Sequence, residues 1–253
     1  MRDRRRMLLS QLGGASFAIP TFDGSHAIFG DEKQGYIECY SSGTITFPKA
    51  GKVDVCIVGG GGKGGTGSGV GNGSPTVWTY SSGKGGDGGK IATYFNIAVI
   101  PHGYNIQIGS AASNSVFDGY SSSGGSVLAS GGVAVTVSGE TAPSPSYWVG
   151  NKGNDAPHIF SDSRFPQYGG GGGSGALTWG VVRAVSGGAG GILGGGSGAS
   201  ATSKTPYYTD GTAGSANTGG GGGGTAYSGG NGSRGTAQQG GSGIVIIRWG
   251  YAA

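Results

Sequence analysis

The sequence predicts an all-β fold in which short β-strands clamp a bundle, or sandwich, of polyglycine II helices. Two observations predict it. An apolar strand at residues 53–58 runs directly into the glycine tract Gly59–Gly62, and a second apolar strand, residues 244–249, closes the chain after another glycine tract. Between these two strands, glycine runs alternate with segments rich in Trp, Tyr and Phe. No segment after residue 35 shows helical periodicity.

Composition excludes the common glycine-rich classes. Gly supplies 63 of 253 residues, and charged residues make up only 11%, against about 25% in ordinary globular proteins. Collagen needs Gly at every third position and abundant Pro, whereas this chain has 9 Pro, none inside its longest glycine runs. A disordered Gly/Ser chain would lack apolar blocks. Here 35% of residues are apolar and fall in strand-like blocks, which predicts a folded protein.

Charge is modest and local. The net charge is +4, and the basic residues Arg2, Arg4, Arg5 and Arg6 contribute it at the N-terminus, so the rest of the chain is close to neutral. A nucleic-acid-binding domain would carry a basic face, so we expect no nucleic-acid partner. No segment approaches the roughly 20 apolar residues of a membrane-spanning helix, so we expect no membrane insertion.

The two cysteines, Cys39 and Cys56, fit neither a disulfide framework nor a metal site. Both lie in predicted strands. We expect two small buried core residues, with a disulfide between them as the less favoured alternative.

Residues 1–35 differ in composition from the rest of the chain and are predicted to form an N-terminal attachment arm. Their arginine run superficially matches a twin-arginine export signal. The apolar stretch that follows is short, however, and Gln11 and two glycines interrupt it. We therefore favour a basic arm that contacts a larger assembly through Arg4, Arg5, Arg6, Leu8 and Leu9.

Residues 36–253 are expected to form one domain of strands and glycine helices with aromatic loops at its tip. Period-two alternation identifies the strands; Val53, Val55 and Ile57, for example, share one face. The predicted strands are residues 36–40, 44–47, 52–58, 90–95, 104–108, 127–129, 133–137 and 244–249.

The glycine runs are predicted to be extended polyglycine II helices. They comprise residues 59–73, 83–89, 169–175, 187–198, 219–224 and 229–243. Such a helix has three residues per turn and no internal hydrogen bonds, so its backbone groups can bond to neighbouring helices where no Cβ atom intervenes. Ordering each glycine costs about 1–2 kcal/mol, while a hydrogen bond returns a net of about 1 kcal/mol. Burial of apolar strand residues must therefore make the free energy of folding favourable, and each buried side chain contributes about 1.5–3 kcal/mol.

Motifs typical of enzymes are weak in this chain. The spacing Gly59-x-Gly61-x-x-Gly64 after a strand matches a dinucleotide fingerprint, but more glycine follows where a helix should begin. Gly83-Lys84 lacks the spacing of a phosphate loop. The three histidines are far apart, and the 12 acidic residues lie in uninformative contexts. We predict no enzymatic activity, no cofactor and no metal site.

The aromatic segments give the positive signal. Tyr and Trp among Ser, Gly and Asn are the mixture that recognition loops favour, because they offer rigid contact area and adaptable hydrogen bonding. The alternative is that these rings cap the glycine bundle as a small local core. The candidate receptor-contact residues are Trp78, Tyr80, Tyr147, Trp148, Phe160, Tyr168, Trp179, Tyr207, Tyr208 and Tyr227.

Several stretches together resemble the glycine-rich domain of bacteriophage and prophage tail proteins. The similarity covers residues 44–249, beginning with the strand that runs into Gly59–Gly62. It continues through residues 99–109, 115–117 and 127–132. The final stretch, Gly-Ser-Gly-Ile-Val-Ile-Ile-Arg-Trp at residues 241–249, is the most specific element.

The resemblance implies a virion tail-fibre tip adhesin, extracellular after release, whose packed polyglycine II helices form a sandwich. Its far-end loops would bind a bacterial surface receptor, saccharide or protein, and its arm would attach to other tail or fibre proteins. The alternative is a structural tail or baseplate component with no receptor. A smaller alternative is another extracellular glycine-helix protein, such as an ice-binding or cell-wall protein. Residues 138–167 interrupt the usual spacing, and whether they form a binding excursion or a structural insertion is left open.

Overall fold

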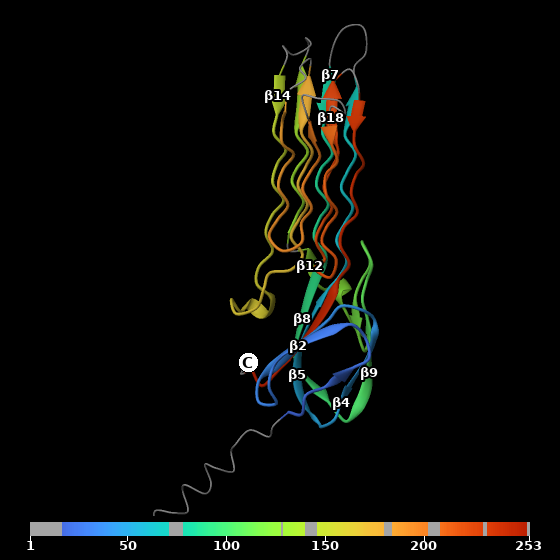
Figure 1. The fold of residues 1–253 in the computed structure, drawn as a ribbon, viewed down its shortest axis with the longest axis vertical. Coiled ribbons are helices and arrows are strands. Elements are labelled where there is room, and N and C mark those ends of the chain that lie inside the picture. The colour runs from blue at the N-terminus through green and yellow to red at the C-terminus, as the bar shows by residue number, and fades with distance from the viewer. Residues whose placement is uncertain are drawn as a thin grey trace, which may run out of the picture.

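The computed structural model describes residues 17–70, 78–127, 129–139, 146–179, 184–201, 208–229 and 232–251. The protein has three parts along its long axis (Figure 1). A two-sheet base lies at one end, a bundle of extended glycine-rich segments rises from it, and small sheets lie at the far end. The all-β prediction is confirmed, since the described helices are two single 3₁₀ turns, η1 (Ser122–Gly124) and η2 (Ile159–Ser161).

The base is a pair of antiparallel sheets. The first sheet has the order β1-β4-β9-β10-β11, and the second has the order β12-β8-β5-β20-β3-β2. In the first sheet the strands are β1 (Thr21–Phe22), β4 (Gly43–Phe47), β9 (His102–Gln107), β10 (Val116–Phe117) and β11 (Tyr120–Ser121). In the second they are β2 (His26–Gly30), β3 (Gly35–Cys39), β5 (Gly51–Val58), β8 (Lys90–Val99), β12 (Ser126–Val127) and β20 (Ile244–Trp249).

The main apolar core lies between these two sheets. Phe47 and Ile106 come from the first sheet, and Val55 and Ile247 from the second; all four are fully buried. Each such side chain contributes about 1.5–3 kcal/mol of hydrophobic stabilisation. The central strands β5 and β20 pair in register from Val58 opposite Ile244 onward, so the core anchors the two glycine tracts that continue from their ends.

The boundary predicted for the attachment arm is wrong for residues 17–35. β1 pairs with β4, and β2 forms the edge of the second sheet beside β3. Phe17 also packs its ring against Phe47 and Trp249, at centroid distances of 5.8 and 5.9 Å. These residues therefore belong to the base. The arm residues Arg4, Arg5, Arg6, Leu8 and Leu9 lie outside the described residues.

Both cysteines are free and buried, as predicted. Burial raises the pKa of the Cys39 and Cys56 thiols to about 12, far above the value near 8.5 for an exposed thiol. Because the thiolate is the reactive form, we expect neither cysteine to react with a maleimide or disulfide reagent at neutral pH until the base unfolds. Labelling followed by mass spectrometry along a urea series measures this. Fast labelling of the native protein would contradict the packing of the base.

Ten extended segments, here called rods, make up the described part of the bundle. They are rod 1 (59–67), rod 2 (82–89), rod 3 (129–135), rod 4 (150–156), rod 5 (169–176), rod 6 (186–191), rod 7 (195–199), rod 8 (210–215), rod 9 (219–225) and rod 10 (235–243). Rod 1 continues β5, and rods 2 and 10 lead into β8 and β20. The sheet therefore sets the spacing of three rods.

Hydrogen bonds between rods show the three-fold geometry of polyglycine II. Along rod 5, residues 171 and 174 donate their N–H groups to rod 4, residues 172 and 175 to rod 2, and residues 173 and 176 to rod 7. Residues three apart therefore face the same neighbour, as a helix with three residues per turn requires. Rod 9 follows the same rotation among rods 5, 1 and 8.

The hydrogen-bond partners place the rods in three layers. Rods 3, 2 and 1 form one outer layer, rods 4, 5, 9 and 10 the middle, and rods 6, 7 and 8 the other outer layer. Rods 5 and 9 are each bonded to six neighbours, and every residue in these two rods is buried. The two central rods are thus enclosed on all sides by backbone.

Enclosure explains where glycine is required. A Cβ atom at Gly171 in rod 5 would overlap the backbone carbonyl oxygen of Ser130. Outer rods have one face open to water, so they accept a side chain at every third position. Lys63 and Thr66 in rod 1 are such exposed residues, and in rod 2 Lys84 is exposed and Asp87 half-buried.

Residues 157–168 leave the bundle and fold back onto the base. Ile159, Phe160 and Phe165 are buried against the outer face of the second sheet, over Ile244 and Ile246. In the second half of the segment 138–167, the chain therefore forms a cover over the outer face of this sheet.

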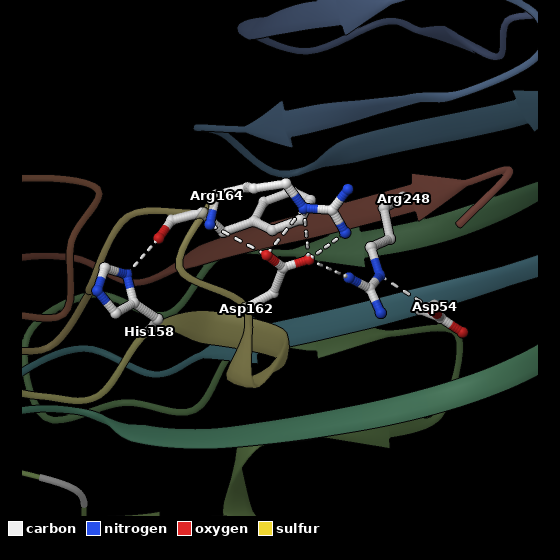
Figure 2. A network of polar contacts seen from close by, with 6 residues as sticks. Asp54, His158, Asp162, Arg164 and Arg248 are labelled. Atoms are coloured by element: carbon white, nitrogen blue, oxygen red, sulfur yellow. Dashed lines mark hydrogen bonds and ion pairs between the residues drawn. The ribbon is translucent and has the colours of Figure 1, made fainter. Parts of the chain in front are cut away.

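Polar contacts hold this cover in place (Figure 2). Tyr168 donates its hydroxyl proton to the buried carboxylate of Glu38 at 2.9 Å. Asp162 accepts from Arg164, with a shortest distance of 2.6 Å, and lies 3.5 Å from Nη1 of Arg248 on β20. Hydrogen bonds from Arg164, aided by the charge of Arg248, lower the pKa of Asp162 to about 2.

Candidate contact surface at the far end of the bundle

Among the described residues, three small sheets lie at the far end, where the rods give way to paired strands (Figure 1). Large side chains return to the sequence here, and they do not fit between backbones enclosed by other rods. The first tip sheet contains β6 (Ser68–Val70), β7 (Trp78–Ser81) and β13 (Thr136–Gly139). The second contains β14 (Ser146–Trp148), β15 (Leu177–Trp179), β18 (Ala226–Gly229) and β19 (Gly232–Arg234). The third contains β16 (Ser200–Ala201) and β17 (Tyr208–Thr209).

Four of the predicted aromatic residues meet at this end and form one stack, here called the tip stack. Trp78 and Tyr80 alternate onto the same side of β7, with ring centroids 5.5 Å apart. Tyr80 contacts Trp179 at 4.7 Å and Tyr227 at 5.7 Å. The tip stack therefore joins the first two tip sheets.

The tip stack is largely packed against the protein itself. Tyr227 is only 8% exposed, and the other three rings are half-buried. Trp179 lies over Gly229, where a Cβ atom would collide with its ring. Burial raises the pKa of the Tyr227 hydroxyl, and the neighbouring Tyr80 adds to the rise. These four rings therefore fix the shape of the tip and offer only part of their surface outward.

Tyr147 and Trp148 lie beside the tip stack on β14, which pairs with β15. Tyr147 is 44% exposed, and Trp148 is half-buried. Tyr208 is half-buried on β17 in the third tip sheet, and Tyr207 lies outside the described residues. Tyr147 is the most outward-facing of the predicted aromatic residues that the structure describes at this end.

Two predicted contact residues lie elsewhere, so their assignment to the tip loops is wrong. Phe160 and Tyr168 are 6% and 8% exposed and belong to the cover over the base. Both follow a turn-rich stretch that resembles a loop in sequence. Their neighbours Ile159 and Phe165 give the local apolar density of a core segment, and that signal could have separated them from the tip aromatics.

Sequence reasoning also missed exposed apolar residues near the tip. Val70 at the end of β6 is 62% exposed, and Val149 just after β14 is 58% exposed. An isolated valine at the end of a strand carries no sequence signal that distinguishes it from a core residue. With Tyr147, these side chains give the far end an apolar component suited to contact with another surface.

The chemistry available here is that of recognition. The tip strands present aromatic rings, hydroxyl groups such as those of Ser81 and Thr136, and strand backbone. The described part of the chain holds no group of three or more His, Cys, Asp or Glu side chains arranged to bind a metal ion. Among the same residues, no helix is long and apolar enough to cross a bilayer.

No protein-family model matches this chain, and comparison with curated proteins gives no significant match.

Proposed function

We propose that this protein is a tail-fibre tip adhesin of a bacterial virus, which binds a receptor on the host surface without enzymatic activity. One observation carries the proposal: partly exposed aromatic side chains gather on strands at the end of a long bundle, opposite the base. Loops and strand ends on a rigid scaffold are where binding usually resides. Aromatic residues dominate such contacts because a large area is buried at little entropic cost.

The base is the part of the protein that we propose attaches it to the rest of the tail. The chain enters the described structure at Phe17, whose ring packs in the base core. Phe17 therefore lies at the end of the molecule opposite the tip sheets. We propose that the basic residues that precede it attach the protein to another tail protein, which would leave the aromatic end free for the host.

Tyr147→Ala and Trp148→Ala are each expected to reduce the affinity for the host about 5- to 30-fold, because each removes a contact worth about 1–2 kcal/mol. The measurement is adsorption of the purified protein to a panel of bacterial strains, followed by affinity titration on those that bind. Tyr120→Ala is the matched control, since Tyr120 is 39% exposed on β11 in the base. Equal adsorption by the wild type and both tip variants would contradict the adhesin assignment.

The second candidate is a structural tail component with no receptor. The internal stacking of Trp78, Tyr80, Trp179 and Tyr227 favours it, because most of their ring area stabilises the tip. A wild-type protein that adsorbs to no strain but assembles with a tail protein through its base would support this candidate instead.

A further inference from the structure

A concavity of about 680 Å³ opens on the outer side of the base, beside the cover, and belongs to neither tip nor core. Its walls are Phe95 on β8, residues 160–164 of the cover, and Arg248 on β20. This volume lies within the range of small-molecule sites, about 300–1,000 Å³. Figure 2 shows the polar side chains that meet at its floor.

The backbone around this concavity is held in conformations that ordinary residues avoid. β8 carries a bulge, in which Phe95 and Asn96 together stand opposite Asp54 of β5, and Asn96 has φ of 57°. On the opposite wall, Phe160 and Ser161 have φ of 55° and 52°. Each such residue costs about 1–3 kcal/mol, and strained residues cluster at functional sites.

The floor is charged but electrically balanced. Arg248 donates from Nε to Asp54 at 3.0 Å, and Arg164 donates to Asp162. Two guanidinium groups thus face two carboxylates, and the concavity has no net charge with which to attract an ion. What remains is directional hydrogen bonding: guanidinium N–H groups as donors, and carboxylate oxygens and serine hydroxyls as acceptors.

Arg248 and Asp162 are held in place before any ligand arrives, whereas the side chain of Arg164 is 67% exposed. The guanidinium of Arg248 lies 4.2 Å from the ring centre of Phe160 and 5.0 Å from that of Tyr251, and its side chain is only 6% exposed. Asp162 is fixed by its bonds to Arg164. Groups ordered in advance lose little conformational entropy when they bind a ligand.

Phe95 supplies the apolar element. Half of this residue is exposed, although its ring approaches Phe160 at a centroid distance of 6.4 Å. A half-exposed aromatic ring beside paired donors and acceptors matches a ligand with one apolar face and several adjacent hydroxyl groups. A neutral pyranose sugar has both features.

We propose that this concavity is a saccharide-binding site for a neutral pyranose. The sugar stacks its C–H face on Phe95, and its hydroxyl groups exchange hydrogen bonds with Arg164, Asp162 and Ser163. The site is separate from the tip sheets and does not depend on the function proposed for them.

Saturation-transfer NMR on the full-length protein tests this site, with the methyl glycosides of glucose, galactose, mannose and N-acetylglucosamine as probes. We expect saturation transfer from the protein to at least one probe. The dissociation constant of that probe should be about tenfold larger in Phe95→Ala, because one aromatic contact is lost. Ser163→Trp, which fills the concavity while leaving Phe95, Asp162 and Arg164 in place, should abolish the signal. Tyr120→Ala on β11 is the matched exposed-aromatic control and should bind as the wild type does.

The inference would be overturned by no transfer to any neutral glycoside, by wild-type affinity in both Phe95→Ala and Ser163→Trp, or by binding confined to methyl glucuronide and inorganic phosphate. Loss of the signal in Tyr147→Ala, with Phe95→Ala unaffected, would place the sugar at the tip and also overturn it. Glycoside binding at the base in a protein that adsorbs to no bacterial strain would support the inference while the proposed tip function fails.

Discussion

Gly171→Val is expected to prevent the bundle from assembling. Its new side chain would overlap the carbonyl oxygen of Ser130, and rod 5 is bonded to other backbones on all six sides. Overpacking an ordinary core costs about 1–3 kcal/mol, because side chains there can shift. Here only backbone could shift, and each displaced inter-rod hydrogen bond adds about 1 kcal/mol. Thermal unfolding of the purified variant, or its failure to accumulate as folded protein, is the measurement.

Two neighbouring positions in rod 6 provide a matched comparison. Gly188 is buried and a Cβ atom there would overlap the carbonyl oxygen of Asn151, whereas Ala189 beside it is exposed. Gly188→Val should therefore resemble Gly171→Val, and Ala189→Val should melt as the wild type does. An unchanged melting temperature for Gly171→Val would contradict the packing of bare backbones in rods 5 and 9.

Arg248→Met is expected to destabilise the base by about 3–5 kcal/mol, because it leaves a buried carboxylate without its partner. The side chains of Arg248 and Asp54 are 6% and 9% exposed. The cover over the outer face would also lose the contact between Arg248 and Asp162. Urea unfolding followed by fluorescence measures the free energy of unfolding.

The double variant Asp54→Asn/Arg248→Met should recover much of that loss. Asparagine keeps an oxygen to accept the Asn96 N–H, which Asp54 binds at 2.8 Å, and it carries no charge. A double variant as unstable as Arg248→Met alone would show that the loss comes from packing under Phe160 and not from the stranded charge.

The strands of the base were predictable because burial on the outside of a sheet imposes alternation. Predicted strands at residues 36–40, 44–47 and 52–58 correspond to β3, β4 and β5, and the closing strand corresponds to β20. Six glycine runs were also predicted as extended helices, and all contribute to rods. Run 187–198 contributes two, because the chain turns at residues 192–194 between rods 6 and 7.

Rods 3, 4 and 8 were not predicted, because they contain few consecutive glycines. Rods 3 and 8 lie in the outer layers and rod 4 lies at the end of the middle layer. Only some faces of these rods meet other backbones, so Val133, Asn154 and Thr212 are exposed. In rods 1 and 2, Gly-Gly-X spacing at residues 61–66 and 85–90 is the sequence signal of a rod with a single exposed face.

The candidate contact surface was likewise predictable in part. Aromatic content indicated Trp78, Tyr80, Trp179 and Tyr227 from sequence, but their assembly into one stack depends on rods 2, 5 and 9 lying side by side. Phe160 carried the same aromatic signal, yet it packs on the base. Phe160 packs on the base because apolar residues on the outer face of the second sheet would otherwise be exposed. The sequence around Phe160 does not reveal that exposed area.

The sequence by itself determined the building units: alternating apolar residues give strands, and runs without Cβ atoms give rods that can bond only sideways. The tertiary structure alone decided which rods are enclosed, which residues cover the base, and which aromatic side chains meet. The reason is that a rod with unpaired backbone groups around its whole circumference has no preferred partner of its own. The strands that anchor a rod, and the order in which the chain connects the rods, determine which rods lie beside it.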